Sequence, residues 1–221
     1  RQYFLNAGLP APSPAMTKSV LMSTARYLTG TGANDTLFSN SQGMGLVDLG
    51  RTFGTTQIIV DDQTAANLLT ATGQSRTFSG VVSDTSQPVR ITLAWTDAPG
   101  STTGGAWNNN LDLTVTANGV TYKGNVFTKD VSQTGGTADA INNVESVFLP
   151  AGTSGSITLT VTAANITSDG VPGNSTLLDQ DYAFTAYNVK NPTCTVYPAP
   201  TGVTATPVGN GRIDLSWQSS G

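Results

Sequence analysis

Histidine is absent from this chain of 221 residues. Without an imidazole, neither a histidine base nor a histidine ligand for zinc can be completed within these residues. Cysteine occurs once, as Cys194, so no disulfide bond can form inside the chain. The thiol is either free or pairs with a cysteine beyond Gly221. The two scarcities exclude imidazole-based catalysis and a disulfide framework.

Charge is scarce as well. Charged residues make up 11% of the chain, against about 25% in an average soluble domain. Serine, threonine, asparagine and glycine are abundant instead, a composition common in secreted β-rich proteins. The net charge is −4 and the sequence has no basic cluster, so we expect no nucleic-acid partner. No apolar run approaches the roughly 20 residues that span a bilayer. We therefore expect a secreted monomer that does not contact a membrane.

Residues 1–54 have a helical character. Ser13-Pro14 is typical of a helix start, because a capping hydroxyl precedes a proline at the first helical position. Met16, Val20 and Leu28 then belong to one apolar stripe at three- and four-residue spacing. Residues 42–51 read as a glycine turn that leads into a short second helix. The abrupt first residues resemble the middle of a helix, so we expect the chain to be cut from a longer one.

From about residue 55 the apolar period changes to two, which indicates strands. The dipeptide Asn118-Gly119 between two alternating segments predicts a type I′ hairpin. Eight strands separated by short turns predict a mainly β fold, an antiparallel β-sandwich or jelly roll over residues 55–190. The expected strands are 57–60, 75–82, 89–95, 111–117, 120–123, 144–149, 156–163 and 182–189.

The tail has a different composition. Residues 191–201 are rich in proline and read as a linker. Residues 202–221 contain two further strand patterns, at 203–206 and 211–217, and about 20 residues are too few for a complete domain. We expect a truncated module there.

Three regions carry a resemblance to known families. The sequences SPAMTKSVLMSTA at residues 13–25 and QGMGLVD at residues 42–48 resemble the C-terminal end of a subtilisin-family catalytic domain. Residues 55–190 look like the jelly-roll domain of one branch of these proteases. That match rests on LAWTDAP, NLDL and NNVE, which begin at Leu93, Asn110 and Asn142. Residues 202–221 resemble the opening of a fibronectin type III module.

The resemblance implies a subtilisin-like serine endopeptidase as the parent protein. Its partners would be its own upstream catalytic domain and its protein substrates. In that family the aspartate, histidine and serine of the triad all precede the segments matched here. The chain contains no Gly-Thr-Ser-Met motif, so we assign no catalytic residue and expect the chain to be inert alone. The alternative is a module that binds a polysaccharide or a protein substrate and delivers a protease to it.

Acidic and amide side chains collect at two predicted strand ends. Asp97 follows one strand, and Asn110 and Asp112 open the next. Two carboxylates brought together repel each other unless a cation or a proton intervenes, and calcium takes six to eight oxygen ligands. The related jelly-roll domains are known for calcium sites. The resemblance therefore favours a calcium site, which Asn143 and Glu145 would complete.

A second interpretation of these residues stays open. Asparagine and aspartate often bond their own backbone in turns, and Glu145 would then pair with an arginine such as Arg90.

Other acidic residues and two tryptophans offer weaker candidates. Adjacent strand residues face opposite ways, so we expect Asp61 and Asp62 not to share a site. Asp179 and Asp181 precede a strand, and we expect both to be solvated. Trp95 and Trp107 are either core residues or a platform for stacking sugars, and the core interpretation is favoured for an aromatic that ends an apolar strand.

Overall fold

The computed structural model describes residues 1–54, 56–192 and 201–218. Two compact units divide the chain, Arg1–Asn191 and Pro192–Gly221. Cys194 and most of the predicted linker lie outside the described residues. No helix in the described part of the chain is both long and apolar enough to cross a membrane.

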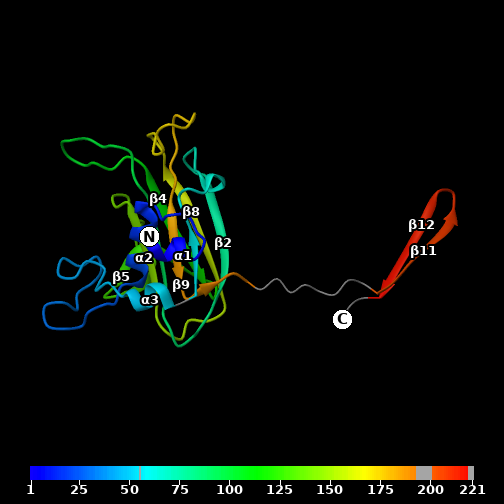
Figure 1. Cartoon of the computed structure of the whole chain (residues 1–221), viewed down its shortest axis with the longest axis horizontal. Coiled ribbons are helices and arrows are strands. Elements are labelled where there is room, and N and C mark those ends of the chain that lie inside the picture. The colour runs from blue at the N-terminus through cyan, green and yellow to red at the C-terminus, as the bar shows by residue number, and fades with distance from the viewer. Residues whose placement is uncertain (55, 193–200, 219–221) are drawn as a thin grey trace. The chain divides into compact units, whose positions relative to one another are not determined.

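Two antiparallel sheets form the first unit (Figure 1). They confirm the predicted β-sandwich. The four-stranded sheet has the order β1 (Gln57–Val60), β9 (Ala183–Tyr187), β3 (Val89–Ala94), β7 (Val144–Leu149). The six-stranded sheet has the order β10 (Val189–Lys190), β2 (Ser75–Val82), β8 (Ser156–Asn165), β4 (Asn110–Ala117), β5 (Val120–Thr128), β6 (Val131–Thr134).

The strand pairs are nested along the chain. β4 pairs with β5, β3 with β7, β2 with β8, and β1 with β9, all antiparallel. Successive pairs alternate between the two sheets, which is the strand order of a jelly roll. The innermost pair is joined by Asn118 and Gly119, both at positive φ as a type I′ turn requires. This predicted hairpin is confirmed.

Three details differ from the predicted strands. β5 continues to Thr128, beyond the predicted range 120–123. β6 was not predicted, and it pairs only with β5 at the edge of the six-stranded sheet. The predicted strand 182–189 is divided between the two sheets at Asn188, which has φ +63°. The buried amide of Asn188 donates hydrogen bonds to the carbonyl oxygens of Asp84 (2.8 Å) and Gln87 (3.0 Å). These bonds hold the chain where it passes from one sheet to the other.

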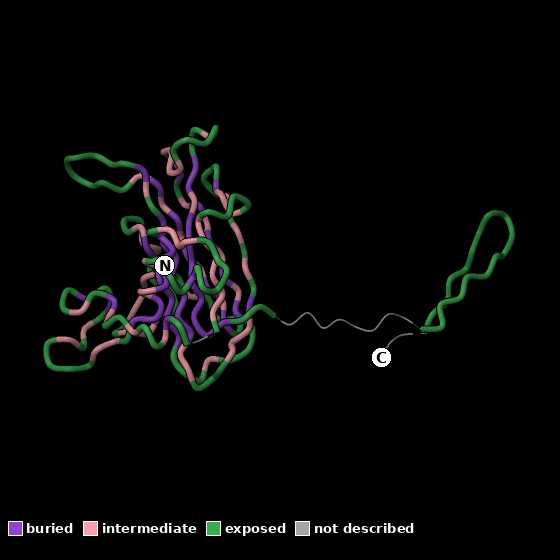
Figure 2. The backbone as a smooth tube through the Cα atoms, in the orientation of Figure 1, coloured by how far each residue is buried: buried purple, intermediate pink, exposed green. Residues whose placement is uncertain are grey.

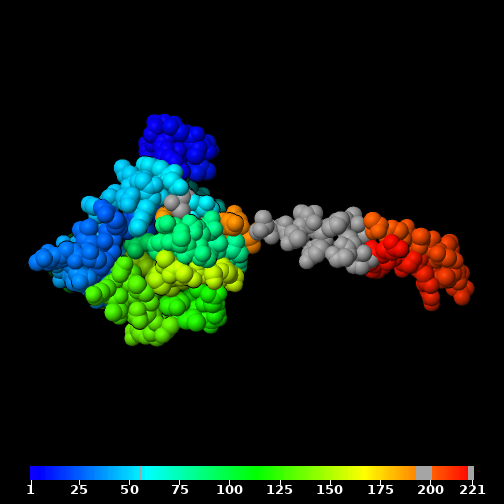
Figure 3. Space-filling view, turned by 90° about the horizontal axis from the view of Figure 1, so that it is seen from below, coloured from blue at the N-terminus to red at the C-terminus, as the bar shows by residue number. Residues whose placement is uncertain are grey.

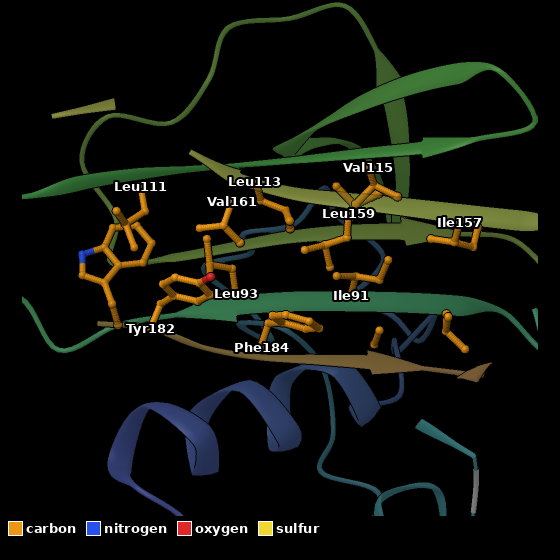
Figure 4. Close-up of a cluster of buried hydrophobic side chains, with 14 of the residues drawn as sticks. Ile91, Leu93, Leu111, Leu113, Val115, Ile157, Leu159, Val161, Tyr182 and Phe184 are labelled. Atoms are coloured by element: carbon orange, nitrogen blue, oxygen red, sulfur yellow. The ribbon is translucent and has the colours of Figure 1, made fainter. Parts of the chain in front are cut away.

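The core lies between the sheets and follows from the period-two pattern (Figure 4). Along β4 every second side chain is buried, because one face of the strand looks inward. In β3, β7 and β9 every residue is buried. Both faces of the four-stranded sheet are therefore covered, one by the other sheet and one by the N-terminal segment. Figure 2 shows the buried residues, in purple, gathered in the middle of the first unit.

A helix from the N-terminal segment supplies part of that cover. The helices are α1 (Gln2–Asn6), α2 (Pro14–Thr24), α3 (Leu49–Gly54) and a short 3-10 helix, η1 (Ala65–Asn67). Ser13 caps α2, since its hydroxyl oxygen accepts the backbone N–H of Met16 at 2.9 Å. α2 ends at Thr24, so the apolar stripe predicted to reach Leu28 is helical over only part of its length.

The apolar face of α2 packs on the sandwich. Met16 is fully buried and Val20 is 4% exposed, in a cluster with Ala94, Val144 and Ala183. Figure 4 shows the helix in dark blue against the outer face of the four-stranded sheet. The hydroxyl of Ser19 also donates to the carbonyl oxygen of Thr92 at 2.7 Å. Residues 1–54 and the sandwich therefore share buried contacts.

The second unit is described over one hairpin, β11 (Thr201–Gly209) and β12 (Arg212–Gln218). Its described residues are all exposed. A single two-stranded hairpin is marginally stable at best in water. The predicted strands at 203–206 and 211–217 are confirmed.

Candidate functional site

The connection from β3 to β4 is closed by Asp97. Its carboxylate accepts three backbone N–H groups, those of Ala98 (2.8 Å), Asn108 (2.7 Å) and Asn109 (2.9 Å). The amide of Asn108 in turn donates to the carbonyl oxygen of Ala98 at 2.9 Å. Both oxygens of Asp97 are thus used to join the two ends of the loop.

Asn109 lies in the interior and bonds two other loops to this one. Its Nδ2 donates to the carbonyl oxygens of Ser168 (3.1 Å) and Asp179 (3.0 Å) and to Oε1 of Gln180 (3.0 Å). Its Oδ1 accepts the N–H groups of Thr167 (2.9 Å) and Ser168 (3.0 Å). A side chain that is 2% exposed thus makes five hydrogen bonds. Asn109 is a structural residue of this end of the sandwich.

Glu145 fills a gap in the six-stranded sheet. β5 pairs with β4 only as far as Lys123 and Thr114, so the next N–H of β4, that of Leu113, has no partner in β5. The carboxylate of Glu145, on β7, accepts that N–H through Oε2. A side chain in place of Gly124 would collide with this carboxylate. The absence of a Cβ at Gly124 therefore makes room for a glutamate between the sheets.

The second oxygen of Glu145 has no hydrogen-bond partner among the described residues. Burial raises the pKa of Glu145 to about 9, and the negative charges of Asp112 and Asp139 add to the rise. Asp112 is half-buried, burial raises its pKa too, and it accepts the amide of Asn110 at 3.2 Å. Asn110 and Asp112 are therefore neighbours, and the charge of Asp112 reaches Glu145. The positive charge of Lys123 acts on Asp112 and opposes the rise in its pKa.

Asn143 has a different environment. Its Oδ1 accepts the ammonium of Lys18 at 2.8 Å, and its Nδ2 donates to the carbonyl oxygen of Trp95 at 3.0 Å. Burial lowers the pKa of Lys18. Asn143 therefore bonds α2 to the end of β3.

The five residues predicted as calcium ligands thus fall into three groups. Asp97 bonds its own loop, Asn143 bonds Lys18, and Asn110, Asp112 and Glu145 lie near one another. Within residues 1–54, 56–192 and 201–218, no three acidic or cysteine side chains are gathered so that they could hold a metal ion. The side chains alone therefore provide at most a partial ligand set.

The predicted pairing of Glu145 with Arg90 is wrong. Nε of Arg90 donates to the carbonyl oxygen of Ser23 at 2.7 Å, and its guanidinium lies 3.5 Å from the centroid of the Phe148 ring.

The two tryptophans that were candidates for a sugar platform differ in exposure. Trp95 is 2% exposed and belongs to the core, as favoured, whereas Trp107 is 52% exposed on the loop that Asp97 closes.

A second acidic cluster was missed by the sequence analysis. Asp61 and Asp62 follow β1 instead of lying within it, so their carboxyl groups adjoin each other and the prediction that they face opposite ways is wrong. Burial raises the pKa of Asp62 to about 6, and the Asp61 carboxyl adds to the rise. Burial likewise raises the pKa of Asp181 to about 7, with a further contribution from the charge of Asp62.

The prediction that Asp179 and Asp181 are solvated is also wrong. Asp179 is fully buried, and its carboxylate accepts the amide of Asn174 at 2.6 Å. Asp181 is half-buried. The pairing of β1 with β9 explains the cluster. Val60, the last residue of β1, lies opposite Phe184 near the start of β9. Asp61 and Asp62, which follow β1, therefore lie at the same end of the sheet as Asp181, which precedes β9.

Comparison with known proteins does not identify the chain. No family model matches it, and no curated protein matches it.

Proposed function

We propose that the chain is the C-terminal part of a secreted subtilisin-like serine endopeptidase, in which the sandwich supports the catalytic domain and performs no catalysis. The sequence motifs at residues 13–25, 42–48 and 93–99 support this proposal. The jelly-roll order of the strands is the architecture that the resemblance implies.

The observation that carries the proposal is the exposed apolar surface of residues 1–54. Large exposed apolar side chains number eight in this segment and five in residues 56–191. The eight are Tyr3, Leu5, Leu9, Phe38, Leu46, Val47, Leu49 and Phe53. Among them Tyr3 and Phe53 adjoin each other, and exposed apolar side chains that adjoin one another are typical of an interaction surface. Figure 3 shows the first residues, in blue, as a protrusion on the surface of the first unit.

The segment thus has two apolar sides. One side of α2 buries Met16 and Val20 against the sandwich. Elsewhere in the segment, half-exposed rings such as Tyr3 and Phe53 lie with centroids 4.5 Å apart. A catalytic domain that continues into this segment would cover the exposed side.

The proposal is tested first by the coding sequence that precedes Arg1. It should specify a Gly-Thr-Ser-Met motif shortly upstream, and its absence there would overturn the proposal. In the full-length protein, Val47→Asp should lower peptidase activity and thermal stability by disturbing the covered surface. The matched control is Val120→Asp on the distant β4–β5 hairpin, which is comparably exposed and should change neither.

The proposal includes a calcium ion that stabilises the sandwich. Glu145 fits such an ion best, since one of its buried oxygens lacks a partner. Asp112 and Asn110 are the neighbouring oxygen donors, and water or backbone oxygens would complete the six to eight ligands that calcium takes. Asp97 and Asn143 already bond protein groups, so we place them outside this reduced set. A cation there would replace the proton that the raised pKa of Glu145 retains near neutral pH, and it would join β7 to β4.

Calcium removal provides the test. A chelator should lower the melting temperature of the chain, because an ion that binds only the folded state stabilises it. Asp112→Asn should abolish this difference, whereas Asp84→Asn, which alters a distant turn, should retain it. An unchanged melting curve in chelator would disprove the calcium site without affecting the motifs that support the protease proposal.

A further inference from the structure

A cavity of about 370 Å³ lies where residues 26–51 meet the sandwich. Four of the ten basic residues of the chain line it, namely Arg26, Arg51, Arg90 and Lys129. Asp130 is the one acidic residue in its lining. In a chain with a net charge of −4, this cavity carries three net positive charges.

Arg90 lies at the buried side of the cavity. It is 4% exposed, and its Nη2 has no hydrogen-bond partner among the described residues. Burial lowers the pKa of Arg90 to about 9, and the nearby charge of Arg51 contributes. The guanidinium remains charged at neutral pH. A buried charged donor left without an acceptor is costly, so the missing partner of Nη2 points to a ligand.

The other cationic groups are also available. Among the described residues, Arg26 and Lys129 form no ion pair, and the contact from Arg51 to Asp48 is long, at 3.8 Å. Like charges held around one cavity repel each other unless an anion intervenes. Asp130 offsets one of the four charges and forms no salt bridge within the described part of the chain.

We propose that this cavity binds a small oxyanion with two negative charges, a phosphate or sulfate group, with Arg90 at its base and Arg26, Arg51 and Lys129 around it. Arginine guanidinium groups present paired donors that match the oxygens of such groups. The site lies wholly within the first unit and does not depend on the proposed protease function.

The size of the cavity bears on the source of the group. A water molecule occupies about 30 Å³ in the liquid, so the cavity has room for about twelve waters, more than the five heavy atoms of one phosphate or sulfate ion fill. The group is therefore either a free ion or the charged end of a larger molecule such as a sulfated sugar. The chemistry that the protein recognises is the same for both sources.

The test is calorimetric titration of the 221-residue chain with sodium phosphate and sodium sulfate at constant ionic strength. We expect saturable binding of one ion per chain and a rise in melting temperature. Arg26→Gln and Lys129→Gln replace exposed side chains that the fold does not need, and each should weaken binding about tenfold, as loss of about 1.4 kcal/mol does. Lys190→Gln, an exposed control on β10 outside the cavity, should leave binding unchanged.

A second arm distinguishes the sources. A sulfated disaccharide that binds more tightly than free sulfate would support a group carried on a sugar, and equal binding would support the free ion. Absence of saturable binding by any of the three probes would overturn the proposal. Binding that survives both Arg26→Gln and Lys129→Gln unchanged would also overturn it, because the cavity would then not be its location.

Discussion

Replacement of Asn109 by alanine should strongly destabilise the end of the sandwich where the β3–β4 loop lies. The side chain is 2% exposed and makes five hydrogen bonds. Truncation leaves the buried carbonyl oxygen of Asp179 and Oε1 of Gln180 without their donor, and each unsatisfied buried group costs about 1–3 kcal/mol. The partly buried N–H groups of Thr167 and Ser168 lose their acceptor as well. We expect a total loss of about 4 kcal/mol, because the three hydrogen bonds that Nδ2 donates are lost together with the two that Oδ1 accepts. For a unit of this size, that loss lowers the melting temperature by about 8–16 °C.

Asn108→Ala is the matched control. Its side chain donates one hydrogen bond, to the carbonyl oxygen of Ala98, and is partly exposed. Its loss should cost about 1 kcal/mol or less. Urea unfolding followed by tryptophan fluorescence measures both variants, because Trp95 is buried in the core. Equal losses for the two variants would refute the structural role of Asn109.

Two further predictions concern pH and the N-terminal helix. The pKa of Asp181, raised by burial to about 7, means that the folded state holds this proton more tightly than the unfolded state, whose aspartate pKa is about 3.9. Its contribution to stability is therefore complete below about pH 4 and is lost as the pH rises to about 7. Asp181→Asn should flatten this part of the pH–stability curve in urea titrations, and an unchanged slope would contradict the assignment. Met16→Ala should lower the free energy of unfolding by about 2–5 kcal/mol, whereas Met16→Leu should cost less than about 1.5 kcal/mol; equal values in calorimetry would show that α2 does not dock as described.

Much of the six-stranded sheet could be predicted because its strands face a core on one side. In β4 the alternation of Leu111, Leu113 and Val115 with polar residues fixes both the period and the buried face. The edge strand β6 lacks this signal, since it pairs only with β5 and buries one residue, Ser132. The end of α2 was misplaced because the apolar stripe continues after the helical backbone stops at Thr24.

The site was less accessible to prediction, because proximity in sequence is a poor guide to proximity in space. Asp97 and Asp112 are close along the chain, yet Asp97 bonds three N–H groups of its own loop and Asp112 accepts the amide of Asn110. Asp62 and Asp181 are far apart along the chain and meet through the pairing of β1 with β9.

The basic cavity shows the same limit. Its four cationic residues occur between positions 26 and 129 with no local cluster, so a search of the sequence finds no basic patch. Only the docking of residues 26–51 on the sandwich brings them together.

From the nested strand pairs we expect an order of folding events. The β4–β5 hairpin closes through a two-residue turn. The pairing of β1 with β9, in contrast, brings together Gln57 and Tyr187, which are far apart along the chain. Long-range pairings of this kind are slow, because the entropy of loop closure is lost before their contacts form. Each inner pair shortens the remaining loop, so we expect the strand pairs to form from the β4–β5 hairpin outward. α2 rests on β3 and β9 and can consolidate only after the outermost pair. Substitutions in α2 should therefore accelerate unfolding more than they slow folding.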